Sequence, residues 1–316
     1  MLGQGGRTGC HAVGPMHPSL LQRRGLAALL TGLALALGTG MGGHAGAAEP
    51  ARQTELLAEH AAQQASLADS PFGAPLLLRG AETGTPLHSG QVLAVLPRPL
   101  DSVATVLRTA AGVCAMLLLQ LNVRACQRTD GTDGQRLQFT AGPLRAALPG
   151  LTTTVALQLQ PQVDAPRHFS TWLTAPAGPL GSSDLQVHLE AVALAPGTTY
   201  LHIGYRQTSG LATRLATQVY LATAGRDKVG FSREGATAEG PPRLVGGERG
   251  ALERQVMRHY LALLVSAGPA GGTPAAQADA RQRAWFALTE RHATQLHEID
   301  LAGYLADKAG VAAGLR

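Results

Sequence analysis

The feature that most constrains the fold is a series of segments between residues 153 and 207 in which apolar and polar side chains alternate. Val155, Leu157 and Leu159 alternate with polar or small residues in "TTVALQLQ", and "DLQVHLEAVAL" repeats the pattern. Alternation with a period of two indicates β-strands with one buried face. "HFSTWLTA" and "TTYLHIGYRQ" complete the series, and Gly/Pro/Ser-rich turns separate its members. We expect an antiparallel meander whose apolar face packs on helices.

Helical spacing flanks this meander on both sides. Apolar residues from Val103 to Leu118 recur three and four residues apart and predict one amphipathic helix over 101–118. "ERGALERQVMRHYLALLVSAG" predicts a long helix over 248–266 with Leu252, Val256, Tyr260 and Leu263 on its apolar side. Shorter helices are expected at 51–68, at 211–224 and in the tail from Gln277, and a strand pair is expected before residue 98. The predicted class is therefore α+β.

The N-terminal segment has the features of a secretory signal. Residues 1–47 contain three arginines and no acid, an apolar run from Gly25 to Leu37, and an Ala45-x-Ala47 site. This pattern predicts cleavage near Ala47 and a periplasmic or secreted protein. A membrane anchor is the alternative, but the run is shorter than the ~20 residues that a spanning helix needs.

Two cysteines remain after such cleavage, Cys114 and Cys126, since Cys10 leaves with the signal. An even pair in an oxidising compartment favours a disulfide. Two buried free thiols are the alternative. Their spacing does not fit a C-x-x-C redox motif, and no His/Cys cluster around them suggests zinc.

Several function classes find no support in the sequence. Neither a G-x-S-x-G elbow, nor H-E-x-x-H, nor a P-loop, nor a dinucleotide fingerprint occurs. The net charge of +5 includes the three arginines of the signal, and no Lys/Arg block follows it, so nucleic acid is not an expected partner. Asp130 and Asp133 fit a hairpin turn better than a calcium loop. We therefore predict neither a cofactor nor a metal.

The charged stretch "ATAGRDKVGF" has two interpretations. Arg226, Asp227 and Lys228 follow the predicted helix stop at Gly225. Charge runs usually lie in solvent, which favours a solvated turn. The alternative is a charged latch at the mouth of a cavity.

The element order resembles the START-like, helix-grip (SRPBCC) superfamily, with "TTYLHIGYRQTSG" at the last long strand and "GALERQVMRHYLALL" at the grip helix. The resemblance implies a curved antiparallel sheet wrapped around a long C-terminal helix and an apolar cavity. "SPFGAPLLL", "LLQLNVRAC", "YLATAGRDKVGF" and "RHYLAL" further resemble a group of exported proteobacterial proteins with no established activity. The expected plan is a signal (1–47), a leading helix (48–70), a helix-grip domain (71–268), and a linker with a helical tail (269–316).

The function expected from this resemblance is an exported protein that holds a hydrophobic small molecule or lipid without chemistry. The candidate ligand contacts are Tyr205, His202, Arg226, Asp227, Lys228 and Tyr260. An interaction module with a closed core is one alternative, and an enzyme that uses Tyr205, His202 or Arg226 on a hydrophobic substrate is another. Peripheral contact with a membrane, and contact with a protein partner, stay open.

Overall fold

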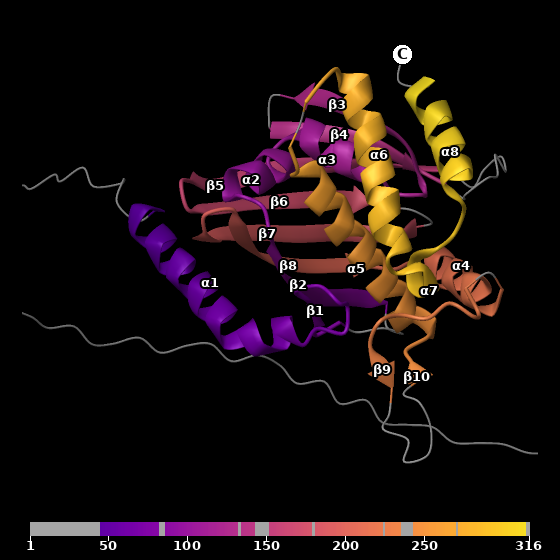
Figure 1. Ribbon diagram of the computed structural model, residues 1–316, viewed down its shortest axis with the longest axis horizontal. Helices are drawn as coiled ribbons and strands as arrows, with labels where there is room; N and C mark the ends of the chain where they lie inside the picture. Colours follow the sequence, from indigo (N-terminus) through magenta and orange to yellow (C-terminus); the bar gives the residue numbers. More distant parts are fainter. Residues whose placement is uncertain are drawn as a thin grey trace, which may run out of the picture. The chain divides into compact units, whose positions relative to one another are not determined.

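Eight strands form one antiparallel sheet in the computed structural model (Figure 1). The order is β1-β2-β8-β7-β6-β5-β4-β3. The strands are β1 (Leu76–Arg79), β2 (Leu87–Leu96), β3 (Val123–Gly131), β4 (Gly134–Ala141), β5 (Thr153–Ala165), β6 (His168–Ala177), β7 (Ser183–Ala195) and β8 (Thr198–Thr208). The predicted meander is confirmed, because β3 to β8 pair in chain order, and β2 closes onto β8.

The structure describes residues 45–81, 86–131, 134–142, 152–178, 181–223, 225–234, 243–269 and 271–313, which belong to one unit, His44–Arg316. Residues 1–44 of the predicted signal lie outside the described residues, and Asp133 does too. The predicted α+β class is confirmed: a long C-terminal helix packs on the antiparallel sheet, and further helices lie at both ends of the chain.

The register places the predicted apolar residues on one side of the sheet, called here the inner face. Leu159 pairs with Leu173, Leu173 with Val187, and Val187 with Tyr205. Three helices pack on this face: α2 (Leu100–Leu107), α3 (Ala110–Leu117) and α5 (Gly247–Ser266). The main hydrophobic core lies between them and the sheet.

The prediction of a single helix over 101–118 is wrong. Helices α2 and α3 meet at 88°, with the break at Arg108 and Thr109. Thr109 caps α3, because its Oγ1 accepts a hydrogen bond from the N–H of Gly112 at 3.0 Å. A Cβ at position 112 would lie 2.3 Å from the carbonyl oxygen of Val106, so the corner requires glycine. The apolar spacing continues through the break and therefore does not reveal it.

Helices α6 (Pro274–Glu290) and α7 (Ala293–Leu296) cover the side of α5 that faces away from the sheet (Figure 1). Helix α8 (Leu301–Ala313) lies beside α6 and contacts β3. The indole N–H of Trp285 donates to the carbonyl of Arg258 at 3.2 Å. The hydroxyl of Tyr304 donates to the carbonyl of Leu119 at 3.0 Å. The tail is thus joined to the core, and α5 is covered on two sides.

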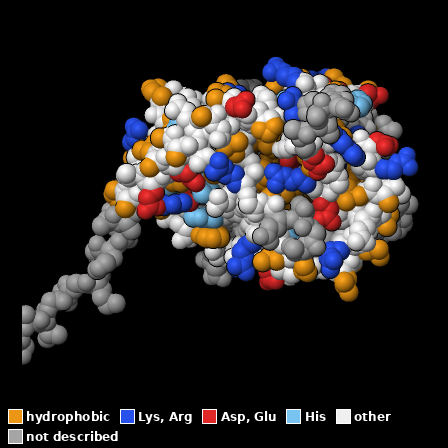
Figure 2. Space-filling model, turned by 90° about the horizontal axis from the view of Figure 1, so that it is seen from below, with side chains coloured by type: hydrophobic (Ala, Val, Ile, Leu, Met, Phe, Trp, Pro, Cys, Tyr) orange, Lys and Arg blue, Asp and Glu red, His pale blue; other side chains and the backbone are white. Residues whose placement is uncertain are grey.

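The opposite side of the sheet, the outer face, carries α1 (Ala45–Ala68). Leu56 and Leu67 pack on the outer face against Leu93, Val192 and Tyr200. Arg52 pairs with the buried Glu190, and Glu59 with His202. Figure 2 shows basic, acidic and histidine side chains close together on the side where α1 lies.

Two smaller elements complete the described part of the chain. Helix α4 (Leu211–Ala222) follows β8, and β9 (Arg233–Glu234) pairs antiparallel with β10 (Arg243–Leu244). In the described ranges no individual helix has the length and apolar character to cross a membrane. The bent α2–α3 pair meets that test jointly, and both of its helices contribute to the core.

Candidate functional site

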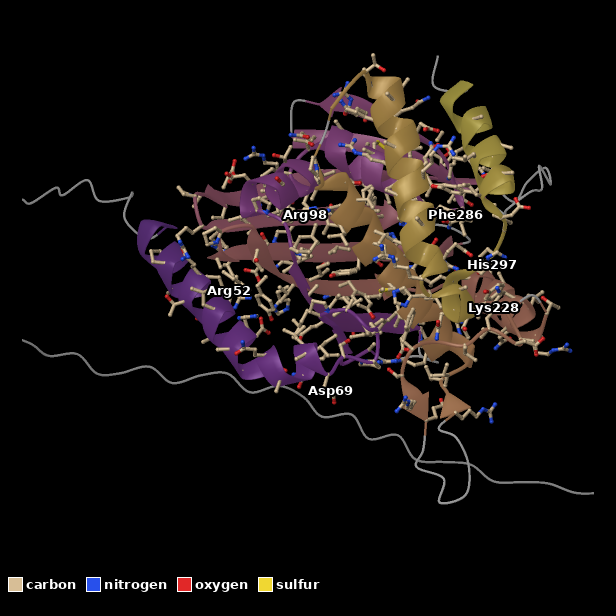
Figure 3. The ribbon with its side chains drawn as sticks, in the orientation of Figure 1. Arg52, Asp69, Arg98, Lys228, Phe286 and His297 are labelled. Atoms are coloured by element: carbon tan, nitrogen blue, oxygen red, sulfur yellow. A yellow bond between two sulfur atoms is a disulfide. The ribbon has the colours of Figure 1, made fainter. Side chains whose placement is uncertain are left out.

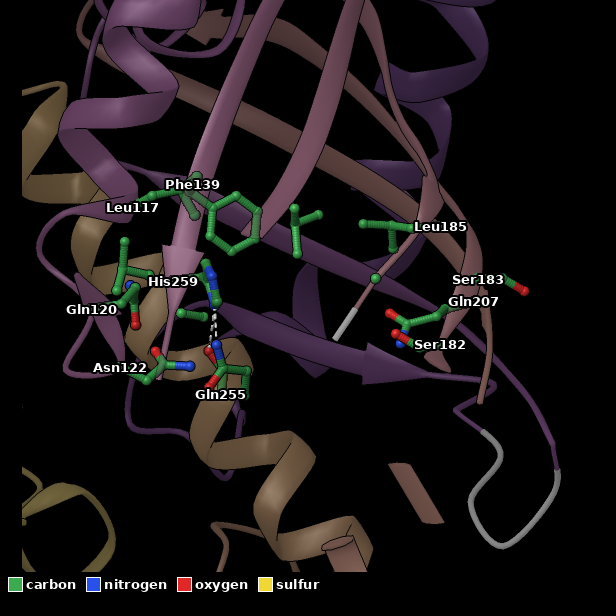
Figure 4. Close-up of a pocket in the computed structure, with 14 residues that line it drawn as sticks. Leu117, Gln120, Asn122, Phe139, Ser182, Ser183, Leu185, Gln207, Gln255 and His259 are labelled. Carbon is green, nitrogen blue, oxygen red and sulfur yellow. Dashed lines mark hydrogen bonds between the residues drawn. The ribbon is translucent and has the colours of Figure 1, made fainter. Parts of the chain in front are cut away.

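A cavity of about 270 Å³ lies between the inner face and α5 (Figure 4). In Figure 4, Leu117, Phe139 and His259 lie on one side of it, and Leu185, Ser182 and Gln207 on the other. The turn from α3 into β3 borders it near Gln120 and Asn122. The cavity therefore occupies one end of the space between sheet and helix.

One wall of the cavity is apolar. It consists of Leu117 from α3, Val123 from β3, Phe139 and Ala141 from β4, Val155 from β5 and Leu185 from β7. The β-alternation predicts the inward direction of Val155 and Leu185. Apolar walls with a few polar groups are typical of small-molecule sites.

The other lining side chains are polar and uncharged at neutral pH. They are Gln120, Asn122, Ser182, Ser183, Gln207, Gln255 and His259. Among the described residues, no Asp, Glu, Lys or Arg lines the cavity. A charged ligand group would lose its hydration there without a counter-ion, which is costly. The lining therefore favours an uncharged ligand.

His259 is the one ionisable side chain in the described lining. Burial lowers its pKa, so the ring is neutral at pH 7. Its Nδ1 lies 2.9 Å from the backbone carbonyl oxygen of Gln255 and 3.1 Å from the side-chain amide nitrogen of the same residue. A neutral imidazole has one donor and one acceptor nitrogen, so the ring can exchange a hydrogen bond with an uncharged ligand.

The predicted disulfide between Cys114 and Cys126 is present, with the Cα atoms 5.4 Å apart. It joins α3 to β3, three residues from Leu117 on one side and from Val123 on the other. The two elements that meet at the cavity are therefore covalently linked.

Lys308 of α8 holds the same turn without a covalent bond. Its ammonium donates to the carbonyl oxygens of Gln120 at 2.5 Å and Val123 at 3.0 Å. Burial lowers the pKa of Lys308 from 10.5 to about 8. The C-terminal tail thus supports one wall of the cavity.

The structure places Tyr205, His202 and Tyr260 away from the cavity lining. Tyr205 is on the inner face, with its buried hydroxyl against Gly90, and no hydrogen-bond partner for this hydroxyl occurs among the described residues. His202 is on the outer face, with Nδ1 2.8 Å from Glu59. Tyr260 is in the core and donates to the carbonyl of Val95 at 3.1 Å. Their role as ligand contacts stays a prediction.

The three charged residues of the "GRDKVGF" string also lie outside the lining. Arg226 and Asp227 are exposed and 3.6 Å apart, as the solvated-turn interpretation expects. Lys228 donates to the carbonyl of His297 at 2.7 Å and pairs with Glu298 (Figure 3). A ligand contact for any of the three stays a prediction.

The second half of that string anchors α5. The buried carboxylate of Glu253 accepts hydrogen bonds from the N–H groups of Phe231 at 2.7 Å and Ser232 at 2.9 Å. Burial raises the pKa of Glu253, but these bonds outweigh burial and hold the pKa below its usual value. A Cβ on Gly230 would lie 2.9 Å from Gly250, so the segment and the helix touch through glycines. The string fixes the start of α5.

The sequence interpretation missed the lining residues of α5. It assigned the apolar side of that helix to the ligand, whereas Gln255 and His259 line the cavity. The available signal was a pair of polar residues four apart, and hence on one side of the helix, beside the apolar run "YLALL".

Comparison with known proteins gives partial similarities of fold. No protein-family model and no curated protein matches the chain. A START superfamily protein from Mycobacterium smegmatis is 11% identical, over 43% of this chain and 91% of that one, with a TM-score of 0.31. Human STARD10 is 9% identical, over 48% of this chain and 64% of that one, with a TM-score of 0.33. The Zhui aromatase/cyclase from a Streptomyces species is 16% identical, over 57% of this chain and 91% of that one, with a TM-score of 0.31.

Proposed function

We propose that this protein binds an uncharged, mainly apolar small molecule in the cavity between the sheet and α5. The observation that carries the proposal is the lining itself, an apolar wall and a polar rim without a charged side chain in the described residues. Apolar burial contributes roughly 25 cal/mol per Å². A ligand that covers this wall therefore gains several kcal/mol.

The size of the cavity limits the ligand. Its volume of about 270 Å³ is at the lower end of small-molecule pockets, which begin near ~300 Å³. It fits a small ring system or one segment of an acyl chain better than a whole phospholipid. The ligand class is therefore narrower than the lipids expected from the sequence.

The rim favours a ligand with a hydroxyl or carbonyl group. The amides of Asn122 and Gln207 both donate and accept, and the neutral ring of His259 has one donor and one acceptor nitrogen. Such groups orient a ligand without requiring a charge. A hydroxylated ring or a quinone-like ketone meets both requirements.

Binding is favoured over the two alternative functions. A closed core would leave no cavity between sheet and helix, which disfavours a purely structural module. Catalysis by acid and base needs paired titratable groups, and His259 is the one ionisable side chain in the described lining. These observations support a carrier or sensor of a small molecule.

We also propose that the protein acts outside the cytoplasm. The sequence features of residues 1–47 support this, and so does the Cys114–Cys126 bond, because disulfides persist mainly in oxidising compartments. Intact mass of protein recovered from the host should begin at Ala48 or Glu49. Retention of residues 1–47 in exported protein would contradict export by cleavage.

Ligand binding is tested first by native mass spectrometry of protein purified from its own host. An added mass that disappears on denaturation identifies the ligand. The emptied protein is then titrated by displacement of a fluorescent probe with matched alcohols, ketones and carboxylates. We expect the alcohol or ketone to bind about tenfold or more tightly than the carboxylate, because the lining holds no counter-ion. Equal affinity for the carboxylate, or no saturable binding, would contradict the proposal.

A further inference from the structure

Five large apolar side chains of the described chain are exposed, and four of them belong to one helix. They are Leu87, Leu211, Leu215, Val219 and Tyr220. Four belong to α4, and Leu87 pairs with Thr208, three residues before that helix. The hydroxyl of Tyr220 contacts Arg254 at 3.2 Å. The other four, Leu87, Leu211, Leu215 and Val219, are called here the α4 patch.

Helix α4 has its apolar side toward solvent. Leu211, Leu215 and Val219 recur every four residues and are 83%, 62% and 55% exposed. Thr213 and Thr217 lie on the opposite side and are half-buried. A surface helix of a globular protein normally has the reverse orientation. Contiguous exposed apolar surface of this kind marks an interaction site.

The charge around the α4 patch selects among the partners of such a surface. No Asp or Glu occurs between Glu190 and Asp227, whereas Arg206 and Arg214 lie in that interval and are exposed. Arg226 beyond the helix is also exposed and is close to Asp227. Two exposed acids also lie near the patch: Asp184, next to the Ser183 that pairs with Thr208, and Asp227, beside Arg226. Arg206 and Arg214 remain as cations beside the apolar side chains, and this arrangement fits a bilayer that contains anionic lipid.

The patch begins at the rim of the cavity. Gly210 precedes α4 and packs on Gly181, where a Cβ on Gly210 would lie 2.4 Å from the carbonyl oxygen. Ser182 and Ser183, which follow Gly181, and Gln207, three residues before Gly210, line the cavity. A membrane in contact with α4 would therefore lie close to the rim through which an apolar ligand enters.

We propose that the α4 patch docks on the surface of an anionic lipid bilayer. The docking needs α4 and not the cavity ligand, so it goes beyond the proposed binding function. Leu211, Leu215 and Val219 enter the interfacial layer, and Arg214 contacts lipid phosphates.

The test is sedimentation of the full chain with vesicles of phosphatidylcholine alone, or of equal parts phosphatidylcholine and phosphatidylglycerol. We expect stronger binding to the anionic vesicles and weaker binding at high salt. Residues 1–47 are common to all variants, so a difference in vesicle binding between variants reflects the contribution of α4. Ligand displacement measured on the same preparations separates failure of docking from failure of the cavity proposal.

The decisive variant is Leu211→Glu/Leu215→Glu. Both side chains are exposed, so the fold is retained, and we expect partition into anionic vesicles to fall roughly tenfold or more. Ala278→Glu on an exposed position of α6 adds the same kind of charge elsewhere and should leave binding unchanged. Val219→Trp should shift its emission to the blue on anionic vesicles.

Three results would overturn the proposal. One is equal vesicle binding by the wild type and the double variant. Another is the absence of a spectral shift for Val219→Trp. The third is a wild type that does not bind vesicles but forms a dimer in analytical ultracentrifugation, while the double variant stays monomeric. That result would make a second copy of the chain the partner of α4.

Discussion

The two ends of the space between the sheet and α5 differ although the same sheet and helix bound them. Beneath α2 the space is filled, and Val103, Leu107, Met257 and Tyr260 are all less than 8% exposed there. Beside the α3–β3 turn it is open, with an apolar wall on one side and polar side chains around its rim. The filled end supplies stability, and the open end is available for a ligand.

The difference has two physical causes. The 88° bend between α2 and α3 directs α2 across β6 to β8, so that its apolar residues fill that end. At the other end the Cys114–Cys126 bond and Lys308 hold the turn in place, so packing is not needed to stabilise it. A cavity can persist where other bonds support its walls.

The largest expected effect comes from the same substitution made at each end. Leu107→Ala removes a side chain that is 2% exposed and should lower the free energy of unfolding by about 2–5 kcal/mol. Leu185→Ala borders space that is already open and should cost less than about 1 kcal/mol. Urea denaturation measures both. Equal losses would show that the two ends are packed alike.

The next effect concerns the covalent support of the open end. Cys114→Ala/Cys126→Ala should lower the free energy of unfolding by about 3 kcal/mol, since the bond closes a short loop. The double variant should be insensitive to reductant, whereas the wild type should lose similar stability when reduced. Unchanged stability on reduction would show that the disulfide does not stabilise the fold.

The burial of Lys308 predicts that the stability of the protein depends on pH. Its pKa is about 8 when folded and 10.5 when unfolded, so between these values the unfolded chain binds more protons. Stability should therefore rise with pH from about 8 to 10.5, by up to about 3 kcal/mol. Lys308→Met should lack this rise. If the free energy of unfolding changed with pH in the same way in the wild type and in Lys308→Met, the buried Lys308 would not be the group that titrates.

Much of this fold follows from periodicity, and the exceptions have identifiable causes. The alternation in β5, β7 and β8 and the length of α5 specify the main elements. The bend at Thr109 depends on one hydroxyl and on the close approach of Gly112 to Val106, which spacing does not show. Apolar spacing does not show which side of α5 faces the cavity, because α6 packs on a second side of that helix and apolar residues occur on both.

The candidate site was less predictable than the fold. The Cys114–Cys126 pair could be inferred from cysteine count and compartment, and Leu185 from alternation. The part played by Lys308 depends on a helix that contacts the turn from far along the chain, which no local pattern reports. Tyr205 and His202 are on one strand but point to opposite faces, as their odd and even positions require.

The smallest expected effects compare two positions on α5. Tyr260→Phe at the filled end removes a hydrogen bond to Val95 and should cost about 1 kcal/mol. Gln255→Ala at the open end changes an exposed rim residue and should stay within about 0.5 kcal/mol. Thermal unfolding of both variants provides the measurement. A larger loss for Gln255→Ala would mean that the rim is structural.

The most direct test of the account is calorimetric titration of the host-derived ligand into a variant whose cavity is filled. Ala141→Trp places a large ring in the open space, and Ala278→Trp places the same ring on the exposed side of α6. The account predicts saturable binding by the wild type and Ala278→Trp, and a loss of at least about tenfold in affinity for Ala141→Trp. Undiminished binding by a folded Ala141→Trp variant would show that the ligand site is elsewhere.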